Sequence, residues 1–392
     1  MNKGGRIMLY FDYAATSIYK PETMVEAVIH ALTHFGNSGR GTSEVSMSAA
    51  KTILRARMLI SELINGEGPS QIVFTHNATE SLNLAIKGLI NKEDHVITTV
   101  MEHNSVLRPL YQLEENGTEL TILEMSDEGV IDPRVVETAI KTNTRALVIT
   151  HASNVTGNIN PLKEIGQVLK KHDVLLIVDA SQTMGAIPID VQDIGVDVLC
   201  FTGHKSLLGP QGTGGLYVNP NVTIRPFKTG GTGVDTFNKH HYPEMPTSLE
   251  AGTLNSHGIA GLLASVKYIM DEGIDNICED ECRKAEYFYQ QLQTIPNLTF
   301  YGNYQQNPKC PIISLNVAGV DSTEVSDWLL NEAGIVTRSG GHCAPLMHLS
   351  HQTMTRGMVR FSLSLKTSYE DIDQVVACLR QFVDKKVDNI YE

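Results

Sequence analysis

The strongest constraint on the fold is an alternation of short β-branched runs with helical patterns, between about residues 50 and 220. Runs such as Ala146–Ile149 and Val174–Val178 are apolar throughout, which is typical of strands covered by helices on both faces. The alternation indicates βαβ units and hence an α/β domain with a mostly parallel sheet. We place the strands at Gln71–His76, His95–Val100, Glu119–Glu124, Arg145–Thr150, Val174–Val178, Val196–Thr202 and Gly215–Val218.

A different pattern begins near Gly258 and predicts a second, smaller domain. Two helical segments, Ile259–Glu272 and Asp275–Gln293, precede the strand-like runs Pro311–Val317 and Val359–Ser364, an order typical of an α+β unit. In this chain of 392 residues, we expect a large domain over residues 16–260. Residues 1–15 plus 261–392 form the expected small domain, and the polar stretch 235–247 is expected to be a loop.

Net charge and cysteine content limit the kinds of binding partner and the cellular compartment that we expect. The chain has 44 acidic and 31 basic residues, for a formal net charge of −13. Affinity for nucleic acid and anionic lipid comes mainly from Lys and Arg, so we expect neither as a partner. The six cysteines are scattered, without a C-x-x-C pair or zinc-like spacing, which favours reduced thiols, no metal site and a cytoplasmic location.

Common nucleotide-binding motifs are missing. The sequence has no G-x-x-x-x-G-K-[ST], and neither Gly212–Gly214 nor Gly231–Gly233 has the third glycine of a dinucleotide fingerprint. ATPase and nicotinamide-dependent functions are therefore disfavoured.

Polar side chains instead follow several predicted strands, at the edge where open α/β sheets bind their ligands. Asn77–Ser81 opens the helical segment Leu82–Leu89, whose free amides and dipole would hold a phosphate together with the Thr79 hydroxyl. Simple N-capping by Asn77 or Thr79 is the competing interpretation of this segment.

Asp179 and Lys205 come directly after the strands Val174–Val178 and Val196–Thr202. Each alone is unremarkable, because most loop Asp and Lys residues are solvated. Together with a phosphate-holding helix start they match pyridoxal phosphate. This cofactor needs a lysine for a Schiff base, an acid that keeps its ring nitrogen protonated, and donors for its phosphate.

With these residues in place, the chain resembles the class V, fold-type I pyridoxal-phosphate enzymes, and within them the cysteine desulfurase and selenocysteine lyase branch. The resemblance extends nearly from end to end. It is carried by Phe11–Ala15, Asn77–Glu80, Met101–His103, Ser153–Gly157, Asp179–Gln182, Gly203–Lys205, Glu250–Thr253, Arg338–Cys343 and Val359–Ser362. It implies a large, mostly parallel seven-stranded sheet domain with a smaller α+β domain that carries a short cysteine loop of the Suf type.

The resemblance also implies roles for individual residues. Lys205 would bind the cofactor covalently, Asp179 would pair with the ring nitrogen, and His103 would stack on the ring and shuttle a proton. Gln182 and Asn154 would hydrogen-bond around the ring hydroxyl. The implied phosphate contacts are Ala78, Thr79, Thr202, His204, and Thr253 from a second subunit, so a homodimer is implied.

Substrate contacts are implied as well. Arg360 matches the arginine that holds the substrate carboxylate, a role suited to its planar fork, and Asn154 and Arg338 are expected beside the substrate. Cys343, in the sequence Gly-Gly-His-Cys, is expected to be the nucleophile, in an exposed and flexible loop where a charged neighbouring imidazole would favour the thiolate.

The sequence departs from the family at Ser43, where relatives usually have a histidine at the mouth of the substrate pocket. This departure leaves substrate preference and rate open, while the cofactor chemistry is unaffected.

The resulting prediction is a cysteine desulfurase that converts L-cysteine to L-alanine and leaves a persulfide on Cys343 for a sulfur-acceptor protein or thiol. Three alternatives remain open: selenocysteine as the substrate, another class V reaction such as transamination or racemisation, and a non-catalytic partner in sulfur assembly. The last two would not require Cys343.

Overall fold

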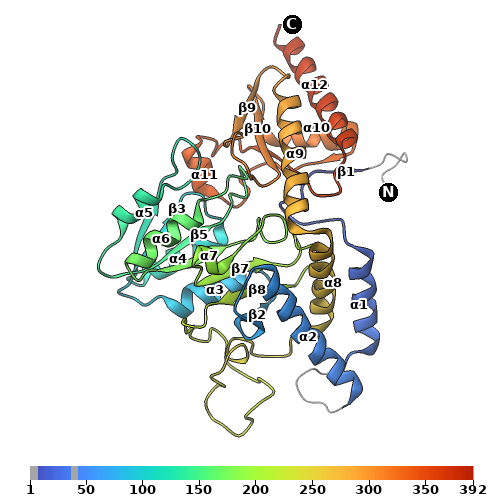
Figure 1. Cartoon of the computed structure of the whole chain (residues 1–392). Coiled ribbons are helices and arrows are strands. Elements are labelled where there is room, and N and C mark those ends of the chain that lie inside the picture. The colour runs from blue at the N-terminus through green and yellow to red at the C-terminus, as the bar shows by residue number, and fades with distance from the viewer. Residues whose placement is uncertain (1–7, 37–42, 392) are drawn as a thin grey trace.

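The computed structural model describes residues 8–36 and 43–391, and shows two packed units (Figure 1). The large unit is built on a seven-stranded sheet and the small unit on a three-stranded sheet. The predicted place of residues 1–7 in the small domain, and the segment 39–42 before Ser43, lie outside the described residues.

The large sheet confirms the predicted strands to within a few residues. Six of its strands run in the same direction, and only β8 is antiparallel to its neighbours. In spatial order the strands are β2 (Ile72–Thr75), β8 (Gly214–Val218), β7 (Val198–Thr202), β6 (Leu175–Asp179), β5 (Thr144–Thr150), β3 (His95–Thr99) and β4 (Glu119–Leu123).

Helices cover both faces of this sheet, as the continuous apolar runs predict. On β5, Leu147 and Ile149 face one hydrophobic core, whereas Ala146 and Val148 face the other. The helices of the large unit are α1 (Glu22–His34), α2 (Glu44–Leu63), α3 (Ala78–Leu89), α4 (Asn104–Glu115), α5 (Pro133–Ala139), α6 (Leu162–Lys171), α7 (Val191–Ile194) and α8 (Ser256–Glu272).

The small unit is an α+β layer, as predicted. Its sheet is antiparallel, in the order β12 (Val359–Ser362), β10 (Ile312–Val317) and β9 (Leu298–Tyr301). β1 (Leu9–Tyr10) pairs in parallel with β11 (Ile335–Val336), which ties the N-terminal segment to this unit. Its helices are α9 (Ile274–Leu292), α10 (Ser322–Ala333), α11 (Pro345–Ser350) and α12 (Tyr369–Tyr391).

The junction between the units bears on the expected domain boundary at residue 260. Ile259, Leu262 and Val266 of α8 pack into the core of the large sheet. α9 begins directly after Gly273, whose positive φ of 82° breaks the helical path. We therefore propose that the large domain extends to Gly273.

No helix among the described residues is both long enough and apolar enough to cross a membrane.

Candidate active site

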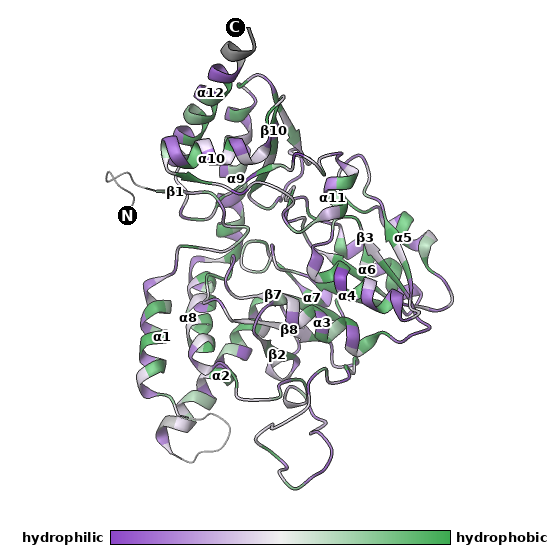
Figure 2. Ribbon diagram, turned by 180° about the vertical axis from the view of Figure 1, so that it is seen from behind, coloured by the Kyte–Doolittle hydropathy of each residue, from purple (hydrophilic) through white to green (hydrophobic). Residues whose placement is uncertain are grey.

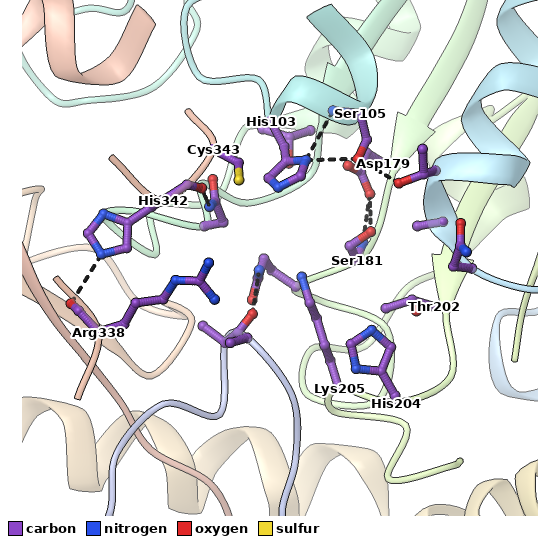
Figure 3. A pocket seen from close by; sticks show the side chains of 18 of the residues that line it. His103, Ser105, Asp179, Ser181, Thr202, His204, Lys205, Arg338, His342 and Cys343 are labelled. Carbon is purple, nitrogen blue, oxygen red and sulfur yellow. Dashed lines mark hydrogen bonds between the residues drawn. The ribbon is translucent and has the colours of Figure 1, made fainter. Parts of the chain in front are cut away.

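A cavity of about 230 Å³ lies where the two units meet, at the carboxyl ends of the central strands of the large sheet. β5, β6 and β7 end at Thr150, Asp179 and Thr202, and all three residues line the cavity. The close-up in Figure 3 shows Lys205 and Asp179 on one wall and Arg338 and Cys343 across from them.

This cavity brings together the predicted site residues except Thr253. It is lined by Ala78, Thr79, His103, Asn154, Asp179, Gln182, Thr202, His204, Lys205, Arg338, Cys343 and Arg360. Thr253 is exposed and lines a different hollow, beside His76 and Lys228. The twelve predicted residues that line the cavity thus lie close together in the structure, while the role of each remains a prediction.

Asp179 is anchored through one carboxylate oxygen. Its Oδ1 accepts hydrogen bonds from the Ser181 amide (2.9 Å) and the Ser181 hydroxyl (2.5 Å). Because the side chain is only 4% exposed, these bonds compensate part of the cost of burying its charge. The other oxygen has no hydrogen bond among the described residues, so it can accept one from a ligand.

Lys205 follows β7 and extends into the cavity, where protein atoms surround it. Burial lowers the pKa of its amine to about 8, although Asp179 acts in the opposite direction. An amine with such a pKa gives up its proton more readily near neutral pH than an exposed lysine does. This suits an amine that has to act as a nucleophile and a base.

His103 precedes α4 and is held by the start of that helix. Its Nδ1 accepts a hydrogen bond from the Ser105 amide (3.0 Å) and lies 2.8 Å from the Ser105 hydroxyl. Burial, with a further contribution from Lys205, lowers the pKa of His103 to about 4. The ring is therefore neutral at pH 7, with its proton on Nε2, because Nδ1 is the acceptor.

The start of α3 offers donors to the cavity. Asn77 caps the helix by accepting from the Glu80 amide, which confirms the capping interpretation. The amides of Ala78 and Thr79, which come before Glu80 in the first turn, have no acceptor within the helix. Capping and anion binding are thus compatible at this helix start.

Buried atoms without partners point to a polar ligand. Thr202 Oγ1 and Asn154 Oδ1 are buried and form no hydrogen bond within the described structure, although both residues line the cavity. Leaving such atoms unsatisfied costs free energy. Their position suits a ligand that carries both donors and acceptors.

Two more predicted cofactor contacts are already engaged with the N-terminal segment. Gln182 donates from Nε2 to the Ala14 carbonyl (3.2 Å), and His204 Nδ1 lies 2.9 Å from the Thr16 hydroxyl. Burial, and then Lys205, lower the pKa of His204 to about 4. His204 is consequently neutral at pH 7.

The cysteine loop is held more firmly than expected. Cys343 is exposed, as predicted, but its carbonyl accepts from the Asn104 amide (2.7 Å), and the His342 carbonyl accepts from Asn154 Nδ2 (2.8 Å). The prediction of a flexible loop is therefore not supported by its contacts. His342 and Cys343 both have positive φ (49° and 55°), a backbone strain that these hydrogen bonds sustain.

The neighbouring imidazole does not supply the expected positive charge. His342 is 5% exposed and lies against His348, with its Nδ1 3.4 Å from His348 Nε2. Burial, followed by the nearby Arg360, lowers the pKa of His342 well below its ordinary value. A neutral His342 does not meet the condition of a charged imidazole, under which it was expected to assist Cys343.

The two arginines of the small unit come from backbone-paired positions. Arg338 and Arg360 form an antiparallel bridge, and both line the cavity. Arg360 is buried and donates to the Asn154 carbonyl and to Asp12, whereas Arg338 is exposed. The cavity therefore contains a fixed guanidinium and a second, more accessible one.

Sequence reasoning missed several residues that line the cavity. Ser105 and Ser181 hold His103 and Asp179, and His342 forms part of the wall. A usable signal existed for both serines, since each lies two residues after a predicted site residue, where a hydroxyl readily bonds backward.

Ser43 is exposed at the N-terminus of α2, and its hydroxyl contacts Ser46 at 3.1 Å. It does not line the cavity of its own chain. The effect of this departure from the family pattern thus stays open.

Comparison with known proteins agrees with this geometry. Residues 9–375 match the family model for class-V aminotransferases. A probable cysteine desulfurase of Methanothermobacter thermautotrophicus is 35% identical over 93% of this chain and 92% of its own. A cysteine desulfurase of Escherichia coli is 32% identical over 96% and 94%.

Solved structures show the same relationship. A cysteine desulfurase of Thermococcus onnurineus superposes with a TM-score of 0.90 at 30% identity, covering 96% of this chain and 95% of its own. A cysteine desulfurase of Escherichia coli gives a TM-score of 0.87 at 26% identity, with the same coverage. On the family match, the sequence identities and the shared fold, this chain belongs to the class-V aminotransferase family, in its cysteine desulfurase branch.

Proposed function

We propose that this protein is a pyridoxal-phosphate-dependent cysteine desulfurase that converts L-cysteine to L-alanine. The observation that carries the proposal is that Cys343 and Lys205 line one cavity, although they come from different units of the fold. A lysine and an exposed thiol in one cavity suit removal of sulfur from an amino acid.

The residues present fit pyridoxal phosphate. The free amides at the start of α3 and the unpartnered Thr202 hydroxyl suit a phosphate, and the available Asp179 oxygen suits a protonated ring nitrogen. Asn154 and Gln182 line the same cavity and would contact the ring hydroxyl, and the neutral His103 would stack on the ring. When bound, the cofactor supplies an electron sink for bonds at the substrate α-carbon.

The chain's own groups would then divide the remaining work. Arg360 binds the substrate α-carboxylate through its buried guanidinium, with Arg338 close to the same part of the cavity. The Lys205 amine would bind the cofactor before substrate arrives and, when free, would accept the α-proton; its lowered pKa suits that proton transfer near neutral pH.

Cys343 would perform the sulfur transfer. Its thiolate attacks the substrate sulfur, so that a sulfur–sulfur bond forms while the carbon–sulfur bond breaks. The persulfide stays on Cys343, and the carbon skeleton takes up a proton and leaves as alanine. Because Cys343 is exposed, a sulfur-acceptor protein or a small thiol can reach the persulfide.

Selenocysteine remains a candidate substrate, because the same groups would bind it. Transamination, racemisation or a purely non-catalytic role receive less support, since none of them needs a cysteine whose loop backbone is held by hydrogen bonds at the cavity. From charge and cysteine content we also propose a cytoplasmic location.

We further propose a homodimer in which Thr253 completes the phosphate site of the partner subunit. α1, α2 and α8 lie side by side (Figure 2). Val25, Ile29 and Leu32 form an exposed apolar stripe on α1, where their exposure is 45%, 58% and 62%. Such a stripe favours association. Light scattering should therefore give twice the chain mass, and Ile29→Lys should lower it.

The proposed reaction has a direct test. The purified protein with pyridoxal phosphate should release alanine from L-cysteine, and mass spectrometry after brief exposure should find a persulfide on Cys343 and on no other cysteine. Alanine formation without that persulfide would reject the sulfur-transfer step. Faster turnover of selenocysteine than of cysteine would favour the lyase alternative.

A further inference from the structure

Arg360 is fixed in place before any substrate binds. It is 2% exposed, its Nη1 donates to the Asn154 carbonyl (2.9 Å), and its Nη2 donates to Asp12 Oδ1 (2.8 Å). Its Nε is buried and has no hydrogen bond among the described residues. The guanidinium thus has a defined plane, and its Nε–H is buried without a partner in the described structure.

Asp12 reaches this guanidinium from outside the cavity. It follows β1 and forms a parallel bridge with Ser362, while the Ala14 amide donates to the Ser362 hydroxyl (2.9 Å). Arg360, Ala14 and Ala15 line the cavity, but Asp12 does not. The Asp12 side chain is 15% exposed. Its carboxylate therefore backs the arginine without taking the place of a substrate.

The charge of Asp12 opposes the attraction that a substrate carboxylate feels. Burial lowers the pKa of Arg360, and Asp12 is the largest influence in the other direction. A neutralising carboxylate within hydrogen-bond distance keeps the arginine charged, yet it also repels a second carboxylate on the far side of the same guanidinium. The Asp12 carboxylate thus fixes the orientation of Arg360 and at the same time weakens the binding of a substrate carboxylate to it.

We propose that Asp12 is a positioning residue that orients Arg360 and weakens its hold on amino-acid carboxylates, so that product alanine leaves readily. The inference rests on the proposed function, in which Arg360 binds the substrate carboxylate. Cysteine and alanine carry the same carboxylate, so this contact stabilises substrate and product alike. Strengthening such a contact lowers KM without raising kcat.

The variant Asp12→Asn separates charge from orientation, because the amide keeps an acceptor oxygen for Arg360. We expect the dissociation constant of propionate, a carboxylate without an amine, to fall roughly tenfold when the opposing charge is removed. Calorimetry on the holoprotein measures this binding independently of turnover. KM for cysteine and the inhibition constant of alanine should fall by a similar factor, with no gain in kcat.

Cysteamine, which has the amine and thiol of cysteine but no carboxylate, is the matched probe. Its binding should be the same in wild type and Asp12→Asn. Asp271→Asn, which removes a surface partner of Lys267, is the control variant and should leave every constant unchanged. If Asp12→Asn does not fold, Asp12→Ser also removes the charge and has the same expected result.

Unchanged or weaker propionate binding in the charge-removed variant would overturn the inference. Weakened binding of cysteamine together with propionate would instead indicate that Asp12 only supports the fold, and would also reject it. Failure of the proposed function is distinguishable, because in that case the wild type itself would release no alanine from cysteine.

Discussion

The two walls of the cavity are built in different ways. On the large-unit wall, Asp179 and Thr202 end neighbouring strands, and their backbones belong to the sheet. On the small-unit wall, Cys343 lies in a loop with positive φ, and its position depends on hydrogen bonds from Asn104 and Asn154 of the other wall. The large-unit wall is thus a rigid scaffold, while the small-unit wall is fastened to it.

This difference suggests a division of chemistry. Groups suited to a cofactor belong to the scaffold, and groups suited to the substrate carboxylate and sulfur belong to the fastened wall. If the division is correct, changes to the large-unit wall should impair the cofactor chemistry, and changes to the small-unit wall should impair sulfur transfer while cofactor binding is kept.

The largest effect is expected from Lys205→Ala. Losing the amine should lower alanine release by at least about a thousandfold, because the variant lacks both the nucleophile toward the cofactor and the base. The visible absorbance of the bound cofactor should change at the same time. Turnover can be followed by alanine release from L-cysteine.

Lys20→Met is the matched control for this change. Burial lowers the pKa of Lys20 to about 8 as well, but its amine donates to the backbone carbonyls of Gly209 and His204 and does not line the cavity. A loss of activity as large in Lys20→Met as in Lys205→Ala would contradict the assignment of the base.

Cys343→Ala should impair only the chemistry that we assign to the small-unit wall. We expect alanine release from cysteine to fall roughly a hundredfold or more, because the sulfur acceptor is gone, while the cofactor absorbance stays as in wild type. Selenocysteine turnover should be partly spared, since the weaker carbon–selenium bond depends less on nucleophilic attack.

The comparison variant is Cys378→Ser, which alters a cysteine of α12 outside the cavity. It should remain fully active. A Cys343→Ala protein that desulfurates cysteine at the wild-type rate would show that the two walls do not divide the chemistry as proposed.

Asp179→Asn should have a smaller effect and leave cofactor binding intact. The amide oxygen can still accept from Ser181, but the negative charge that stabilises a protonated ring nitrogen is lost. We expect a decrease in turnover of about tenfold to a hundredfold. Near-normal rates, measured with the cofactor absorbance unchanged, would exclude this role for Asp179.

The two walls also differ in how far sequence could predict them. Asp179 and Lys205 were found because parallel strands end at a common edge, so proximity follows from the pattern. The contact between Cys343 and the large-unit wall depends on hydrogen bonds across the junction, and no local pattern encodes them. The neutral state of His342 was missed for the same reason, since burial against His348 is a tertiary effect.

The same limit applies to the pair of Asp12 and Arg360, whose members lie near opposite ends of the chain. The two-residue strands β1 and β11 were also not predicted, because two residues give no measurable periodicity, and β9 was missed as well. By contrast, every strand of the large sheet was predicted, and in the central strands β5, β6 and β7 the apolar runs record burial on both faces.

The last expected effect concerns stability rather than turnover, and it involves two buried carboxyl groups, Glu102 of the large unit and Glu281 of α9. Glu102 is 0% exposed, and its Oε1 accepts from Thr99 Oγ1 (2.7 Å) and from the Thr150 amide (3.0 Å). Burial raises the pKa of Glu102 from 4.5 to about 8, and burial likewise raises that of Glu281 to about 8.

Between pH 4.5 and 8 the folded protein holds a proton on Glu102 that the unfolded chain has released. The contribution of Glu102 to the free energy of unfolding should therefore fall as pH rises through this window, by at most about 1.4 kcal/mol per pH unit, and level off above it. Buried histidines such as His103 and His151 act in the opposite direction below about pH 6.5, so the contribution of Glu102 is read from the difference between wild type and Glu102→Gln. Glu102→Gln mimics the protonated acid and should remove that part of the decline, visible in urea midpoints at pH 5, 6, 7 and 8. Part of the pH dependence of the free energy of unfolding that remains in Glu102→Gln comes from Glu281, so Glu281→Gln should reduce it separately. If Glu102→Gln keeps the full wild-type slope, Glu102 is ionised in the folded protein, and the large unit then contains a second buried negative charge that acts on Asp179 from outside the cavity lining.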